Sequence, residues 1–202
     1  MQSPQYAIFT QKLSPAHRLA LVVGILCLIL QISGLPELLR FSRDEIMAGQ
    51  WWRLLTGNLV HLGYSHLLLN LAGLAVISAL LGQSMGVRAW AVTGLISMAG
   101  VGLGLLLFDP QLKWYVGLSG VLYGLLLGGA IAEFRQQKLI ALVVGLYTIG
   151  KIVWEQLHGA VESSEKLAGG TVIVNAHMYG MIAGAITVLA LLGIGTLTQR
   201  AT

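Results

Sequence analysis

The chain has 202 residues, of which 56% are hydrophobic and 10% are charged, and its formal net charge is +4. Soluble domains carry about 25% charged residues, so this composition indicates an all-α, polytopic membrane protein that lies in the lipid bilayer. No stripe of basic residues with interleaved aromatic residues is present, so nucleic acid is not expected as a partner. The one cysteine, Cys27, excludes a disulfide within the chain, and no Cys/His cluster has the spacing of zinc ligands. We therefore expect no metal and no cofactor.

We predict a single membrane domain over residues 1–202. Its six spans are expected at about residues 19–35, 66–81, 89–108, 119–133, 139–154 and 176–197. The fourth span is short, because about 15 residues at a rise of ~1.5 Å give roughly 22 Å, against a hydrocarbon core of ~30 Å. Ser119, at the start of this span, is therefore expected below the membrane surface, in a cavity that water can reach.

The segments that connect the spans are polar or amphipathic. Residues 36–63 are amphipathic and contain the pair Trp51 and Trp52, so we expect this segment to lie at the membrane interface. Residues 109–115 and 155–175 are expected to be loops.

Six spans put both termini on one side of the membrane. Short segments on that side carry basic residues next to the ends of the spans, with Glu133 as the one acid among them. By the positive-inside rule we expect this side to be the cytoplasm. The basic residues are Lys12, Arg18, Arg88, Arg135, Lys138 and Arg200.

Ser119 begins the fourth span between two glycines, Gly117 and Gly120. Small residues then recur at every fourth position, which aligns them on one helix face that a second helix can approach closely. The sixth span carries a matching stripe next to His177. The two stripes consist of Gly120, Gly124 and Gly128, and of Ala176, Gly180 and Gly184.

Packing of the two stripes is expected to bring His177 within ~3 Å of Ser119, as activation of a serine nucleophile by a general base requires. No Asp or Glu within a span is placed to orient His177, so we expect a Ser–His dyad. Tyr123, one turn after Ser119, is expected to stack on the imidazole and hold it. The alternative interpretation of each stripe is helix packing alone.

His66 and Asn70 are four residues apart at the start of the second span, so they share a helix face. Both side chains donate hydrogen bonds and lie on the same side of the membrane as Ser119. Such donors, together with the Ser119 N–H, are typical of an oxyanion hole. His61 lies five residues before His66 and either assists this hole or is a loop histidine.

The combined pattern resembles the rhomboid family of intramembrane serine proteases across essentially the whole chain. The matching pieces are Trp52-Arg53, His61 with His66 and Asn70, Gly117-Leu118-Ser119-Gly120, and Ala176-His177 with Gly180. The resemblance implies a six-transmembrane-helix rhomboid core, with Ser119 as the nucleophile and His177 as the base.

The same resemblance assigns the supporting residues. It implies that His66 and Asn70 form the oxyanion hole with His61 close by, and that Tyr123 packs on the base. Trp52 and Arg53 resemble the structural motif of the first loop of the family.

Within the family, the sequence is similar to the rhombosortases in its Ala-Gly-Gln-Trp-Trp-Arg-Leu-Leu-Thr-Gly and Tyr-Val-Gly-Leu-Ser-Gly runs. This similarity implies substrates that are exported proteins with a C-terminal tail. The tail has a glycine-glycine motif, a transmembrane helix and a basic end. It also implies a bacterial inner membrane and an active site that opens to the periplasmic side. The oligomeric state, and the choice of water or an amine as acceptor of the acyl group, stay open.

Three alternatives remain beside this interpretation. A general rhomboid protease would cut other single-span proteins. A rhomboid-like protein without catalysis would only bind membrane helices, but the intact Ser119 and His177 argue against it. A small transporter is disfavoured because the polar residues lie at one end of their spans rather than at the midplane.

Lys151 and Glu155 lie four residues apart near the outer end of the fifth span. One interpretation is an ion pair at the membrane interface. The other is a role in reading the substrate, because the fifth span of rhomboids flanks the substrate gate.

Overall fold

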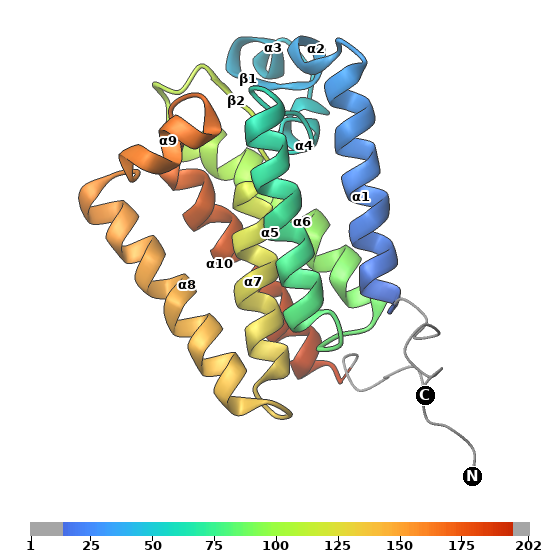
Figure 1. Ribbon diagram of the computed structural model, residues 1–202. Coiled ribbons are helices and arrows are strands. Elements are labelled where there is room, and N and C mark those ends of the chain that lie inside the picture. Colours follow the sequence, from blue (N-terminus) through green and yellow to red (C-terminus); the bar gives the residue numbers. More distant parts are fainter. Residues whose placement is uncertain (1–13, 196–202) are drawn as a thin grey trace.

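The computed structural model describes residues 14–195, which form a bundle of six long helices (Figure 1). These helices are α1 (Pro15–Ile32), α5 (Tyr64–Leu81), α6 (Val87–Phe108), α7 (Ser119–Glu133), α8 (Lys138–His158) and α10 (Val174–Gly193). The bundle confirms the predicted all-α class of a polytopic membrane protein. Lys12 and Arg200, which belong to the expected charge distribution, lie outside the described residues, as do positions 196 and 197 of the expected sixth span.

Short elements gather at the upper end of the bundle in Figure 1. They are the helices α2 (Pro36–Leu39), α3 (Arg43–Met47), α4 (Arg53–Thr56) and α9 (Glu162–Ala168) and the strands β1 (Phe41–Ser42) and β2 (Trp114–Tyr115). The strands pair antiparallel, with Phe41 opposite Tyr115. The segment 36–63 is therefore folded into short helices and a strand, and the two expected loops contain β2 and α9.

Four of the long helices, α5, α6, α8 and α10, are long and apolar enough to cross a membrane. The apolar parts of the other two are shorter, namely Ala16–Ile32 in α1 and Ser119–Glu133 in α7. The start of α1 and the end of α10 lie at the same end of the bundle (Figure 1). The short α7 begins at Ser119, as the sequence pattern predicts.

Apart from α7, the long helices begin one to four residues before the expected positions, and α1 and α10 end earlier than expected, at Ile32 and Gly193. Two of the differences have identifiable reasons. α1 begins at Pro15 because the Ser14 side chain accepts a backbone N–H of the first turn and proline suits that turn. α8 does not end near residue 154 but continues through His158, and it ends at Gly159, where φ is +80°. Because of this additional turn, Glu155 belongs to α8 rather than to a loop.

Two arginines hold the short elements on the bundle. Arg43 donates to the carbonyl oxygens of Leu105, Leu106 and Asp109 at the end of α6, where carbonyl groups lack helical partners. It also donates to the carbonyl oxygen of Leu112 in the loop that follows. Arg53 is buried and donates to the backbone of α2 and its flank, through the carbonyl oxygens of Glu37 and Arg40. Its neighbour Trp52 is half exposed.

The two helices with the small-residue stripes, α7 and α10, pack backbone to backbone. A Cβ atom added to Gly180 would collide with the carbonyl group of Gly120, and one added to Gly184 would collide with that of Gly124. In return, a Cβ on Gly120 would lie 2.6 Å from the carbonyl oxygen of Ala176. No side chain separates the two helices along this contact, so any larger residue forces them apart.

We expect Gly180→Ala to lower the free energy of unfolding by about 1–3 kcal/mol, because the added methyl group overlaps backbone atoms of α7. Gly150→Ala in α8 is the matched control, since nothing lies within 4 Å of a Cβ at that position. The control is expected to be neutral or to stabilise by up to about 1 kcal/mol through helix propensity. Unfolding in detergent micelles measures both variants, and equal stabilities would contradict the backbone contact.

Candidate active site

Ser119 is the first residue of α7, and the turn before it is tightly constrained. Gly117 has a φ of +131°, which favours glycine, and an added Cβ would lie 2.7 Å from Cε1 of His66. The Gly117 N–H donates to the Gly57 carbonyl oxygen at 3.1 Å. The Gly117 carbonyl oxygen accepts the Tyr115 hydroxyl at 2.7 Å. These contacts fix the turn that presents Ser119.

His177 lies in the first turn of α10, and this turn is tied to the end of α6. The carboxylate of Asp109 accepts the amide of Asn175 with one oxygen and the hydroxyl of Tyr179, at 2.8 Å, with the other. The backbone contact between α7 and α10 then sets the separation of the two helices. As a result His177 faces Ser119.

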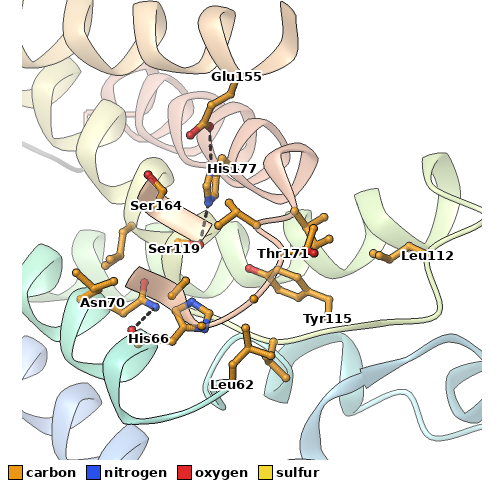
Figure 2. Close-up of a pocket in the computed structure, with 18 of the residues that line it drawn as sticks. Leu62, His66, Asn70, Leu112, Tyr115, Ser119, Glu155, Ser164, Thr171 and His177 are labelled. Atoms are coloured by element: carbon orange, nitrogen blue, oxygen red, sulfur yellow. Dashed lines mark hydrogen bonds and ion pairs between the residues drawn. The ribbon is translucent and has the colours of Figure 1, made fainter. Parts of the chain in front are cut away.

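The structure brings Ser119 and His177 together, with 2.9 Å between the serine Oγ and the imidazole Nε2. The other ring nitrogen, Nδ1, lies 2.8 Å from Oε2 of Glu155 (Figure 2). His177 and Glu155 are 5% and 3% exposed. The expectation that no carboxylate reaches His177 is wrong, because the additional turn of α8 carries Glu155 to the imidazole.

Lys151 binds the same carboxylate, with its Nζ 2.6 Å from Oε1 of Glu155. Each carboxylate oxygen thus has one partner, Lys151 or His177. Lys151 and Glu155 therefore form the ion pair that the first of the two interpretations predicts. It differs from a simple interfacial pair because Glu155 is buried against the imidazole.

The ring of Tyr123 lies one turn after Ser119 and packs on the imidazole. The ring centroids of Tyr123 and His177 are 4.6 Å apart, and the ring planes meet at 32°. The imidazole is therefore held between a hydroxyl, a carboxylate and an aromatic face.

His66 and Asn70 lie on the side of Ser119 opposite His177 (Figure 2). Both belong to the first two turns of α5 and line the same cavity as Ser119. Asn70 Nδ2 donates one hydrogen to the His66 carbonyl oxygen at 3.1 Å, which leaves its second hydrogen for another acceptor. The Ser119 N–H lies in the first turn of α7, where N–H groups have no acceptor within the helix. The Asn70 amide, the His66 imidazole and the Ser119 N–H are therefore the candidate donors on this side of the cavity.

His61 is buried behind His66 and is not among the residues that line the cavity. The two rings meet edge to face, with centroids 5.1 Å apart at 84°. Burial lowers the pKa of His61 to about 3, with a smaller contribution from His66, so His61 is neutral at physiological pH. This placement favours packing support of His66 over a direct hydrogen bond to a ligand in the cavity.

The cavity that contains Ser119 has a volume of about 640 Å³. Its walls come from α5, from the ends of α7, α8 and α10 near Ser119, and from α9 with Ser164. Leu62 and the segments 111–116 and 168–173 complete them. This volume lies within the range of pockets that enclose small ligands, roughly 300–1,000 Å³. Among residues 14–195, no group of three or more His, Cys, Asp or Glu side chains is arranged to hold a metal ion.

Sequence reasoning missed the contacts that three residues make at the site, namely Glu155, Asp109 and Tyr115, and only the contact of Glu155 left a signal. Thr148, Ile152 and Glu155 are spaced four and three apart, share the buried face of α8, and are followed by no helix breaker before Gly159. That spacing extends the helix to Glu155. The contacts of Asp109 and Tyr115 depend on the path of a loop, and no local pattern indicates them.

The chain resembles known rhomboid proteins in two comparisons. Residues 48–194 match the family model of the rhomboid domain. Over 81 residues the chain is 32% identical to "Putative rhomboid protease YdcA" from Bacillus subtilis (strain 168), a region that covers 38% of this chain and 39% of the relative. The similarity thus spans about two fifths of the length of that relative. Both findings agree with the resemblance predicted from the motifs.

We expect Tyr123→Ala to slow the reaction of Ser119 with a fluorophosphonate about two- to tenfold. Aromatic contacts of this kind contribute about 0.5–1.5 kcal/mol. Without the Tyr123 ring, the imidazole loses this stabilisation of its position facing Ser119. Tyr123→Phe keeps the ring and is expected to react at the wild-type rate. Labelling rates of purified protein measure the effect, and an equal loss in both variants would point to the hydroxyl instead of the ring.

Proposed function

The chain belongs to the rhomboid family, and from this we propose that it is an intramembrane serine protease in which Ser119 is the nucleophile and His177 the general base. Rhomboid proteases act within the lipid bilayer on transmembrane proteins, so we expect substrates of that class. The observation that carries the proposal is the hydrogen bond of 2.9 Å between Ser119 Oγ and His177 Nε2, inside a cavity of the helix bundle.

The proposed reaction begins when Ser119 Oγ attacks the carbonyl carbon of a substrate peptide and His177 Nε2 takes the hydroxyl proton. A tetrahedral intermediate forms and its oxygen becomes negatively charged. When the C–N bond breaks, His177 returns the proton to the leaving amine. Water or an amine, deprotonated by His177, then attacks the acyl-serine ester. The ester C–O bond breaks, His177 returns the proton to Ser119 Oγ, and the second product is released.

Stabilisation of the negative oxygen is assigned to three donors. They are the second amide hydrogen of Asn70, the imidazole of His66 and the Ser119 N–H. Donors of this kind contribute most when they are fixed before the reaction and shielded from water. Two features support such fixing, namely the bond of Asn70 to its own helix and the packing of His61 behind His66.

For the substrate we propose a rhombosortase-like specificity. The substrate would be an exported protein with a C-terminal tail that contains a glycine-glycine motif, a transmembrane helix and a basic end. A helix must unwind before its carbonyl groups reach Ser119, and glycine lowers that cost. A bacterial inner membrane with cytoplasmic termini and a periplasmic active site belongs to the same proposal. The support for this specificity is the sequence similarity in the runs around Trp52 and Ser119.

The nucleophile is tested with Ser119→Ala, which we expect to abolish both substrate cleavage and fluorophosphonate labelling, since it removes the attacking oxygen. Ser164→Ala is the matched control because Ser164 lines the same cavity, and this variant is expected to remain labelled. Gel fluorescence and mass spectrometry of the labelled peptide give the result. A Ser119→Ala protein that still cleaves would rule out the proposed nucleophile. A wild-type protein that binds transmembrane helices but is neither labelled nor active would favour the non-catalytic alternative.

The substrate class is tested with a reporter protein that carries a glycine-glycine motif before a transmembrane helix and a basic end. Replacement of the two glycines by leucines is expected to slow cleavage about tenfold. Each glycine lowers the cost of unwinding a helix by ~0.8–1.0 kcal/mol relative to alanine. Mass spectrometry of the products gives the cleavage site and detects an added amine. Equal rates for the two reporters would exclude the glycine-glycine specificity.

A further inference from the structure

We propose that Glu155, held by Lys151, is a positioning residue that orients His177 and keeps its proton on Nδ1. The site then works as a Ser–His–Glu triad rather than as a dyad. This inference rests on the proposed protease function, since it concerns the same base.

The geometry on which the inference rests is a continuous chain of contacts across three helices. Lys151 Nζ lies 2.6 Å from one oxygen of Glu155, and His177 Nδ1 lies 2.8 Å from the other. His177 Nε2 then lies 2.9 Å from Ser119 Oγ. Figure 2 shows Glu155, His177 and Ser119 in a row, joined by these contacts.

The proton positions follow from the chemistry of imidazole. A carboxylate only accepts hydrogen bonds, so the nitrogen that faces Glu155 must carry the hydrogen. A neutral imidazole has one such hydrogen, and Nε2 is therefore left with a lone pair that accepts from Ser119. The opposite tautomer would point a hydrogen at the serine and could not remove its proton. Glu155 also stabilises the imidazolium that forms once the serine proton has moved.

An ion pair that only stabilises the fold would not require the Glu155 carboxylate to point at His177. The buried residues of α8 are Ala141, Thr148, Ile152 and Glu155. Thr148 satisfies its hydroxyl within α8 by donating to the Val144 carbonyl oxygen at 2.7 Å. Glu155 is the buried side chain of this helix that bonds to another long helix. A buried carboxylate is costly unless it is paired and hydrogen-bonded. Lys151 supplies the opposite charge, and His177 supplies a hydrogen bond.

The test compares Glu155→Gln with Glu155→Asp by the rate of fluorophosphonate labelling at saturation and by the concentration that gives half saturation. We expect Gln to lower the maximal rate by about 10²- to 10⁴-fold without changing the half-saturating concentration, because an amide can donate to Nδ1 and favour the wrong tautomer. Asp keeps the charge and is expected to react at least tenfold faster than Gln.

The order of the two variants separates positioning from packing. Gln has the size of Glu and fills its space, whereas Asp leaves a void, so a structural role predicts that Gln is the milder change. A Gln variant that labels as fast as the Asp variant, or faster, would therefore overturn the proposal. Glu162→Gln is the control, since it removes an exposed i,i+4 ion pair with Lys166, and its labelling is expected to be unchanged.

Two further measurements keep the outcome decisive. Thermal unfolding reports whether each variant is folded. If the Gln variant is not, Glu155→Ala is labelled with and without added formate, which returns a carboxylate to the site. Acceleration by formate supports the proposal, and no acceleration overturns it. Labelling of wild-type protein at a residue other than Ser119 would instead defeat the protease proposal, so the two failures are distinguishable.

Discussion

The backbone contact between α7 and α10 is the constraint on which the rest of the site depends. Ser119 and His177 lie in the first turns of two different helices, so their separation is set by how closely those helices approach. Glycines on both helices allow their main-chain atoms to come into direct contact, as at Gly120 and Gly180. With a larger side chain at either position the helices would lie further apart, and the hydrogen bond of 2.9 Å between the two side chains would be lost.

The polar side chains that position the site are joined in connected sets. Burial of an unpaired polar group among membrane helices is costly, so each such group requires a partner or a function. Glu155 joins Lys151 to His177, and Asp109 joins the end of α6 to the first turn of α10. Through these connections, the same contacts that satisfy buried polar groups also fix the geometry of the site.

Four long helices contribute to the site, and they do so unequally: α5 carries His66 and Asn70. α7 and α10 carry the serine and the imidazole and are locked together by their backbones. α8 contributes Glu155 and Lys151 and keeps most of the rest of its surface apolar and outward-facing, with Leu146 and Val153 exposed. The orientation of the imidazole is thus coupled to the position of α8, whereas its distance from Ser119 is not.

The sequence by itself determined the membrane class, the short fourth span and the two stripes of small residues, because composition and spacing along a helix are local properties. Those local patterns were enough to predict that Ser119, His177, Tyr123, His66 and Asn70 lie near one another. Only the tertiary structure decided that Glu155 reaches His177, that Arg43 binds the end of α6 and that His61 lies behind His66. These contacts depend on where α8 ends and on the path of the loops, and residues far apart in the chain meet there only once the helices are packed.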